Sequence, residues 1–259
     1  MPSVLSADGT KIAFDQAGQG PPVILVVGAF NDRSTGAPLA KALESQLTVF
    51  NYDRRGRGAS GDVQPYAVER ELEDLDALIR KAGGSAGVFG YSSGGTLGLQ
   101  AAARGLNITK LAVYEAPFVV GDDFPRPPRD LAAQLAKLVS AGRRGEAVEL
   151  FQTKLVGMPE AVVAQMRHAP FRQALEAMAH TLVYDTEVVG DLSLPTAELP
   201  SVTVPTLVAY GGDSPAFMGN AAKALASALP HGRVRGLEGQ THDIVPSALA
   251  PVLVEFFNR

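Results

Sequence analysis

Short apolar runs alternate along most of the chain with segments whose apolar residues recur at helical spacing. The run from Val23 to Val27 has no polar residue, which is typical of a strand buried on both faces of a parallel sheet. Parallel neighbours need helical crossovers, and these are almost always right-handed. We therefore predict an α/β fold with a mostly parallel central sheet and helices on both faces. Its strands are predicted at residues 23–27, 47–52, 86–90, 108–114, 206–210 and 234–237.

A predicted hairpin over residues 3–17 precedes this sheet, and helices are predicted over 68–81 and 247–257. Pro251 is expected either to kink the last helix or to mark its first turn. In open parallel sheets, sites lie outside the carboxyl ends of the strands. The loops that follow the predicted strands are therefore the places to search for function.

The alternation breaks between about residue 119 and 202, where the pattern is helical. Asp130 is expected to cap one helix, Pro159 to begin a second, and the apolar residues from Phe171 to Leu182 to mark a third. The stretch far exceeds the usual short connection between strands. We predict a helical cap, residues 119–202, inserted in a core of residues 1–118 and 203–259. The alternative is that these helices pack on the outer face of the sheet.

Composition excludes several classes of function. The chain has 259 residues, no cysteine and a net charge of −4. The lack of cysteine excludes disulfides, thiolate metal sites and a cysteine nucleophile. No basic field favours nucleic acid or membrane, and neither a spanning run nor a secretory signal is seen. We expect a cytoplasmic protein without metal, cofactor, nucleic-acid or membrane partner; the oligomeric state stays open.

The most informative motif is Gly90-Tyr91-Ser92-Ser93-Gly94, which reads G-x-S-x-G between a predicted strand and a helix rich in small residues. A serine on such a sharp turn has its hydroxyl exposed at the edge of the sheet, and the glycines remove side chains that would clash. Ser92 is therefore the predicted nucleophile. The alternative is a glycine-rich turn with an incidental serine.

A serine nucleophile needs a base and an acid that orients the base. His242 follows the last predicted strand and is the expected base, because the histidine comes last in the nucleophile–acid–base order. Two residues compete for the acid. Glu115 ends the strand next to the nucleophile strand and is a lone charge among apolar residues, whereas Asp213 follows the strand 206–210. We favour Glu115 and keep Asp213 as the alternative.

These features together resemble the α/β-hydrolase superfamily over nearly the whole chain. The resemblance rests on Val26–Phe30, on the D-x-R-G-x-G-x-S loop of residues 53–60, on the Ser92 motif and on Gly239–Asp243. In that superfamily the acid usually stands three residues beyond the glycine that ends the penultimate strand, which is Ser214 here. A minority, including the zearalenone-type lactonases and some haloalkane dehalogenases, places it where Glu115 stands. The chain also departs from the family in having Val27 where a histidine is common.

The oxyanion formed during acyl transfer needs hydrogen-bond donors. The amide of Ser93 begins a helix and is unpaired there, and the turn after strand 23–27 offers the amide of Ala29. Phe30, Asn31 and Tyr91 are expected to line the substrate pocket. The arginine-rich loop 53–60 could be mistaken for an anion site, but its glycines indicate a turn that braces the Ser92 motif.

The sequence therefore predicts a serine hydrolase that cleaves a small, largely apolar carboxylic ester or lactone through an acyl-enzyme. The alternatives are a carbon–carbon bond hydrolase, a cofactor-free haloperoxidase or perhydrolase, a lyase, and a non-catalytic ligand-binding protein of the same fold. A serine at this position disfavours dehalogenase and epoxide hydrolase chemistry, which the superfamily performs with aspartate. The fold alone does not decide among the remaining functions.

Overall fold

In the computed structural model, which describes residues 2–122 and 124–259, eight strands form one sheet in the order β1-β2-β4-β3-β5-β6-β7-β8. Met1 and Asp123, which fall within the predicted core and cap, lie outside the described residues. The pairs β1–β2 and β2–β4 are antiparallel. All pairs from β4 to β8 in the strand order are parallel. The strands are β1 (Ser3–Leu5), β2 (Lys11–Ala17), β3 (Pro22–Val26), β4 (Thr48–Tyr52), β5 (Ala86–Tyr91), β6 (Ile108–Tyr114), β7 (Thr206–Gly211) and β8 (Gly232–Leu237).

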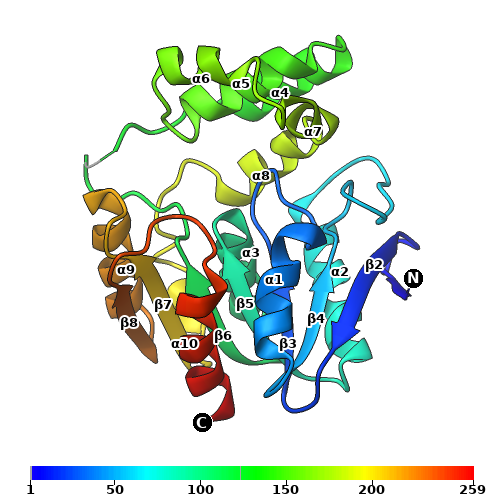
Figure 1. Ribbon diagram of the computed structural model, residues 1–259, viewed down its shortest axis with the longest axis vertical. Coiled ribbons are helices and arrows are strands. Elements are labelled where there is room, and N and C mark those ends of the chain that lie inside the picture. Colours follow the sequence, from blue (N-terminus) through cyan, green and yellow to red (C-terminus); the bar gives the residue numbers. More distant parts are fainter. Residues whose placement is uncertain (1, 123) are drawn as a thin grey trace.

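Two apolar clusters cover the two faces of this sheet. One contains side chains of α1 (Arg33–Leu43) and α10 (Pro246–Asn258), and the other contains those of α2 (Val68–Lys81), α3 (Ser93–Ala103) and α9 (Ala216–Ala228). Figure 1 shows α1 and α10 in front of the strands. The predicted α/β class, with a mostly parallel sheet and helices on both faces, is confirmed.

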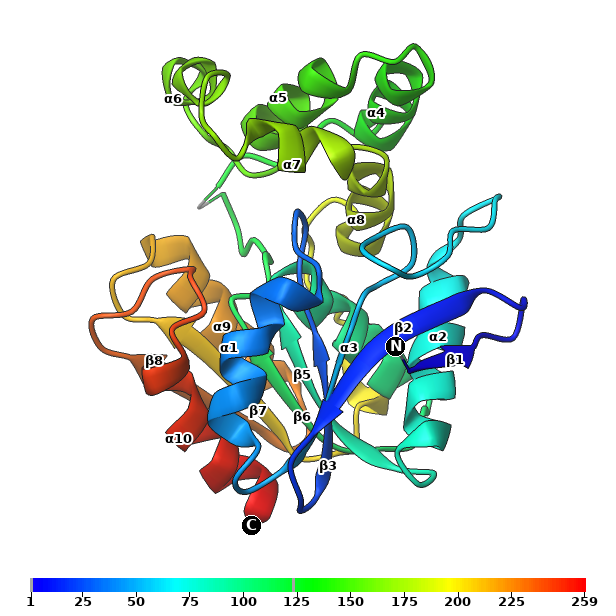
Figure 2. The same cartoon turned by 45° about the vertical axis from the view of Figure 1, so that its right-hand side comes forward.

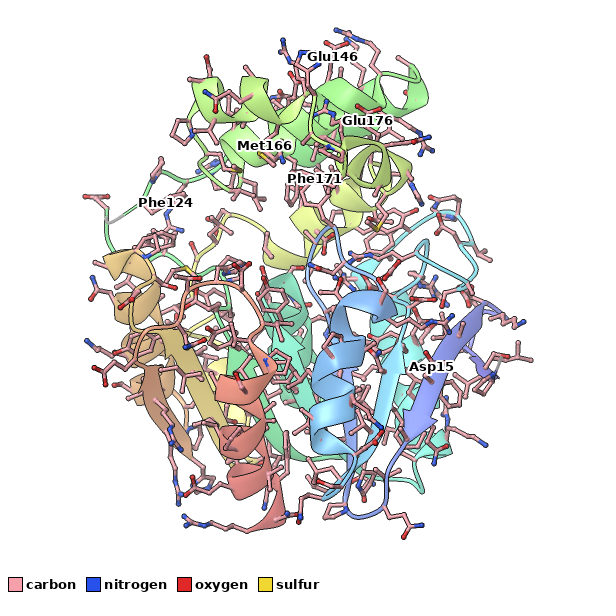
Figure 3. The ribbon with its side chains drawn as sticks, viewed as in Figure 1. Asp15, Phe124, Glu146, Met166, Phe171 and Glu176 are labelled. Carbon is pink, nitrogen blue, oxygen red and sulfur yellow. The ribbon has the colours of Figure 1, made fainter. Side chains whose placement is uncertain are left out.

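The chain between β6 and β7 forms a separate layer of helices, which Figures 1 and 2 show beyond one end of the sheet. Figure 3 places Phe124 on the segment that climbs from the sheet to this layer. Among these helices α8 lies nearest the sheet and contacts α3. The layer consists of α4 (Leu131–Ser140), α5 (Arg144–Lys154), α6 (Glu160–Met166), α7 (Arg172–Ala177) and α8 (Thr181–Val189); a short 3-10 turn, Leu199–Ser201, precedes β7.

Two local expectations, and one of the two alternatives for Pro251, are wrong. The Asp130 carboxylate accepts from the Gln134 side chain and caps no backbone amide. The single helix expected between Phe171 and Leu182 is divided into α7 and α8 by tight turns, in which the Thr181 amide and hydroxyl both donate to the Met178 carbonyl. Pro251 does not start α10, which begins at Pro246 and contains Pro251 in its interior. None of the described helices combines the length and apolar character needed to span a membrane.

Candidate active site

Ser92 stands on a strained turn between β5 and α3. Its φ of 54° and ψ of −126° lie in a region that residues other than glycine rarely adopt. The Ser92 amide donates to the Tyr114 carbonyl over 2.9 Å, which ties the turn to the end of β6. The flanking glycines are needed for close approach, since a Cβ on Gly90 would lie 2.5 Å from the Gly94 carbonyl oxygen. The predicted strand–turn–helix setting of the motif is therefore present.

The turn after β3 packs directly against the serine. A Cβ on Gly28 would lie 2.7 Å from the Cβ of Ser92, so only glycine allows this approach. Ala29 follows in this turn, and Ser93 is the first residue of α3. Within the described part of the chain, neither the Ala29 amide nor the Ser93 amide has an acceptor. Two free donors beside a serine hydroxyl suit the binding of a developing oxyanion.

Glu115 and His242 form an acid–base pair. The Nδ1 atom of His242 lies 3.2 Å from Oε2 of Glu115, while Oε1 of Glu115 accepts from the Gly211 amide at 2.7 Å. Glu115 is 2% exposed and, with a φ of 55°, follows directly on β6. Both carboxylate oxygens therefore have partners, which offsets the cost of burying the charge.

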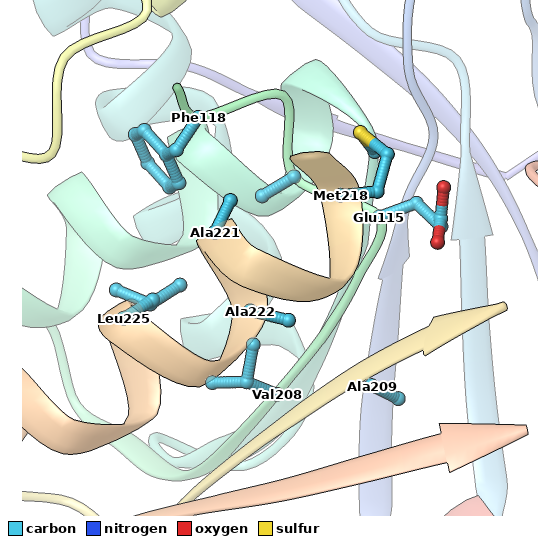
Figure 4. Close-up of a pocket in the computed structure, with 9 residues that line it drawn as sticks. Glu115, Phe118, Val208, Ala209, Met218, Ala221, Ala222 and Leu225 are labelled. Atoms are coloured by element: carbon cyan, nitrogen blue, oxygen red, sulfur yellow. The ribbon is translucent and has the colours of Figure 1, made fainter. Parts of the chain in front are cut away.

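The other side of Glu115 is apolar. Figure 4 shows its carboxylate pointing away from the apolar side chains of a small cavity. The cavity has a volume of about 10 Å³ and is lined by side chains that include Phe118, Met218 and Leu225. The carboxylate thus has its polar partners on one side only, toward β7 and His242.

His242 lies beside the residue that precedes the serine. Its ring centroid is 5.0 Å from that of Tyr91, and the loop before it is held by a hydrogen bond from the Tyr114 hydroxyl to the Thr241 carbonyl. Burial, together with Asp243 and Glu115, raises the pKa of Tyr91 well above its usual range, so its phenol stays neutral. The His242 side chain is 48% exposed, and no hydrogen bond joins it to Ser92 in the described residues.

Asp213, the alternative acid, lies on the surface. Its side chain forms no hydrogen bond or ion pair with His242 in the part of the chain that the structure describes. The backbone around it has a different role. The Asp213 amide donates to the Gln240 carbonyl at 2.9 Å, and the Gly212 amide donates to the Leu237 carbonyl at 2.7 Å. The loop of residues 211–214 therefore supports the loop that carries His242 through main-chain hydrogen bonds.

Two expected pocket residues serve the turn after β3. The side-chain amide of Asn31 donates to the Ala29 carbonyl at 2.6 Å and so closes the turn on itself. Phe30 has a φ of 60°, and its ring meets the edge of Phe151 on α5, with centroids 5.4 Å apart. Phe30 thus connects the turn to the helical layer. Tyr91, the third expected pocket residue, is buried between Tyr114 and His242.

Arg54 and Arg57 of loop 53–60 do brace the Ser92 turn, but through a residue that sequence reasoning missed. Arg54 pairs with Glu71 and with Asp185 of α8, and Arg57 pairs with the same Asp185. Burial alone would raise the pKa of Asp185, but Arg57, Arg54 and the Ser93 hydroxyl outweigh it and hold the pKa below its ordinary value. The carboxylate is therefore ionised at neutral pH.

Asp185 could have been suspected on one ground. The three arginines of loop 53–60 need carboxylate partners if they are buried, which indicates an acid elsewhere in the chain. Nothing in its local pattern, however, says which of the many acidic residues meets that loop. The pairing spans 131 positions between Arg54 and Asp185.

Together, these groups can perform acyl transfer: a partly exposed serine on a strained turn, two free amides beside it, and an imidazole oriented by a buried carboxylate. A family model described as "Alpha/beta hydrolase family" matches residues 23–253. The chain is also similar to the crystal structure of an alpha/beta hydrolase from Sphaerobacter thermophilus DSM 20745. That likeness has a TM-score of 0.93 and 55% identity over 99% of this chain and 100% of the other.

More distant structures share the fold. An esterase from Exiguobacterium antarcticum has a TM-score of 0.74 at 19% identity, covering 99% of each chain. An enol-lactonase from Burkholderia xenovorans LB400 has a TM-score of 0.71 at 23% identity, covering 100% of each. Curated relatives are covered only in part. An uncharacterized hydrolase of Bacillus subtilis (strain 168) is 35% identical over 104 residues, which make up 39% of this chain and 38% of that protein. For a polyketide synthase of Burkholderia thailandensis, the chain spans only 12% of the relative's length.

Proposed function

The chain belongs to the alpha/beta hydrolase family, and from that premise we propose that it is a serine hydrolase that cleaves a carboxylic ester or lactone through an acyl-enzyme. The observation that carries the proposal is the buried Glu115 carboxylate on Nδ1 of His242, beside the strained turn of Ser92. A carboxylate on Nδ1 selects the tautomer whose Nε2 is free to accept a proton.

The reaction would run as follows. Nε2 of His242 takes the proton of the Ser92 hydroxyl as the oxygen attacks the ester carbonyl. The carbonyl oxygen becomes negative and is held by the amides of Ala29 and Ser93. The imidazolium, stabilised by Glu115, then protonates the leaving alcohol. Water activated by the same imidazole releases the acid and restores the serine.

The proposal requires that Ser92 and His242 meet in the substrate complex. Hydrogen bonds between a nucleophile and its base are often long in free enzymes and tighten when substrate binds. The half-exposed imidazole has room to adjust, because only its Nδ1 side is held. A bound acyl group would cover the ring and displace water from the serine.

We propose further that the helices of residues 119–202 act as a cap over the site and that the substrate is small and largely apolar. The contact of Phe30 with Phe151 supports this, since it brings an apolar side chain of α5 to the turn that carries the oxyanion donor. A lactone fits the same mechanism, with its alcohol remaining attached to the acyl group.

The first test is labelling with a fluorophosphonate, which reacts only with activated serines. Mass spectrometry of the peptides should place the adduct on Ser92, and Ser92→Ala should abolish it. The absence of an adduct on the folded wild-type chain would refute the proposed nucleophile. The peptide that contains Ser60 should carry no adduct and serves as an internal control in the same digest.

The second test is turnover of a panel of p-nitrophenyl esters and lactones by the wild-type chain and Ser92→Ala. Turnover that depends on Ser92 is expected. Saturable binding of these compounds without turnover would instead indicate a ligand-binding protein. Cleavage of a vinylogous diketone in preference to every ester would indicate a carbon–carbon bond hydrolase.

A further inference from the structure

Asp185 on α8 is a fully buried carboxylate that joins the helical layer to both sides of the oxyanion site. Its Oδ1 accepts from the Ser93 hydroxyl at 2.7 Å and from Nη1 of Arg54 at 2.7 Å. Its Oδ2 accepts from Nη2 of Arg57 at 2.6 Å. A single side chain of the inserted helices thus holds Ser93 directly and, through Arg57, reaches the turn that carries Ala29.

Arg57 transmits this contact to the first donor. Its Nη1 donates to the carbonyl of Gly28 and, at 3.0 Å, to that of Asn31. The Gly28 carbonyl and the Ala29 N–H belong to one peptide group, which is planar and trans, so the two point in opposite directions. Holding the carbonyl therefore sets the direction of the Ala29 N–H.

The second donor is reached more directly. Ser93 supplies the other amide from the first position of α3, and its hydroxyl is bonded to Asp185. Arg54 lies beside the same hydroxyl: its Nη1 is 3.4 Å from the Ser93 hydroxyl and 3.3 Å from the Val27 carbonyl. The Ala29 amide is therefore oriented through Arg57, and the residue that carries the Ser93 amide is anchored by its hydroxyl; both sets of charge-assisted hydrogen bonds converge on Asp185.

We propose that Asp185 is a positioning residue that couples the docking of α8 to the alignment of the Ala29 and Ser93 amides. The inference rests on the proposed function, because only acyl transfer gives the two amides a role. It goes beyond that function in assigning a part of the site to the inserted helices. When α8 leaves the core, Arg57 and Ser93 lose their shared acceptor and both donors lose their fixed direction.

A matched control is available in the same loop. Arg55 pairs with Asp74 of α2 at 2.7 Å, and the two side chains are as buried as Arg57 and Asp185. In the described residues, Asp74 forms no hydrogen bond or ion pair with Ser93 or with the turn of residues 27–31. Asp74→Asn therefore disturbs a buried ion pair without touching the oxyanion donors.

The experiment compares an ester with its thionoester, whose developing negative charge falls on sulfur, a poor acceptor. Asp185→Asn should lower kcat for the ester by roughly 10- to 100-fold with KM unchanged, since misplaced donors lose stabilisation only in the transition state. It should also shrink the preference for the ester over the thionoester. Asp74→Asn should change neither quantity.

Ser93→Ala is the second variant, because it removes only the hydroxyl and keeps both ion pairs of Asp185. It should lower kcat less than Asp185→Asn does and shrink the ester preference in the same direction. A wild-type kcat and preference in folded Ser93→Ala and Asp185→Asn would overturn the proposal. Equal losses in Asp185→Asn and Asp74→Asn would overturn it too, because the effect would then be general destabilisation.

Failure of the proposed function can be told apart from failure of this inference. A wild-type chain that hydrolyses no ester and takes no fluorophosphonate would refute the function alone. The inference is then read from the ¹H and ¹⁵N amide shifts of Ala29 and Ser93. Asp185→Asn should shift both amides, whereas Asp74→Asn should shift neither; unchanged amides in Asp185→Asn would overturn it.

Discussion

At the scale of single residues, substitution separates the two carboxyl groups that could orient His242. Glu115→Gln keeps the shape but favours the wrong tautomer of the imidazole, so kcat should fall by about 10³- to 10⁴-fold. Asp213→Asn should leave kcat unchanged, because Glu115 holds Nδ1 of the histidine and the exposed Asp213 side chain lies outside that hydrogen bond. Steady-state kinetics on one ester, with circular dichroism to confirm folding, measures both. A loss confined to Asp213→Asn would make Asp213 the acid.

Gly28 gives a second prediction at this scale. A methyl group on Gly28 would lie 2.7 Å from the Cβ of Ser92, so Gly28→Ala must move the oxyanion turn away from the serine. We expect a loss of about 10²-fold in kcat, the usual effect of a displacement near 1 Å. Gly98→Ala in α3 is the control, because its added Cβ meets the flexible end of Leu111 at 3.1 Å and Val88 at an ordinary contact distance of 3.5 Å, and no backbone atom. Equal kcat in the two variants would contradict the close packing described here.

The site could be predicted in part because some of its residues carry local signals. Ser92 stands in a five-residue motif, and Glu115 is a lone charge at the end of an apolar strand. Asp185 has no such signal, because its partners Arg54 and Arg57 are more than 120 positions away. Only the folded chain shows that a helix outside the sheet supplies the carboxylate that the arginines need.

At the scale of secondary structure, the proline inside α10 offers a direct test. Pro251 has no N–H to donate to the Ser247 carbonyl, and its ring is exposed, so it contributes little packing. Pro251→Ala should raise the free energy of unfolding by about 1–3 kcal/mol and leave kcat unchanged. Urea denaturation measures the first quantity. A variant of lower stability would show that the ring supports the helix by contacts with its neighbours.

Helices such as α1 and α5 were not predicted because their apolar residues recur with only weak helical periodicity. The sheet strands and α2 have clear patterns and were predicted within a few residues. α1 contains Gly36 and Pro38, which mask a helix that Asp32 nevertheless caps by accepting from the Ser34 amide at 2.8 Å. α5 buries only a few side chains, among them Val148 and Phe151, against other helices. Its helical state depends on tertiary contacts that a short stretch of sequence does not carry.

At the scale of the whole molecule, stability should fall in acid. Burial raises the pKa of Asp8, but hydrogen bonds from Thr10 and Arg55 outweigh it and lower the pKa from 3.8 to about 2. The unfolded chain therefore binds more protons between these values. The stabilising contribution of Asp8 is complete above about pH 4 and is lost as the pH falls toward 2.

Asp8→Asn should thus reduce the free energy of unfolding at neutral pH and flatten its decline between about pH 4 and pH 2. Urea denaturation of the two proteins at several pH values measures both effects. Parallel curves for the wild-type chain and Asp8→Asn across this range would show that Asp8 keeps an ordinary pKa in the folded state.

The ion pair between α8 and loop 53–60 restricts how this architecture can be rearranged. Arg57 has no other carboxylate partner in the part of the chain that the structure describes. A shortened protein without the inserted helices would hold that guanidinium unpaired, at a cost of several kcal/mol. Exchange of this insertion between homologues, as in chimeric enzymes built to change selectivity, therefore needs a transplanted acid at the Asp185 position.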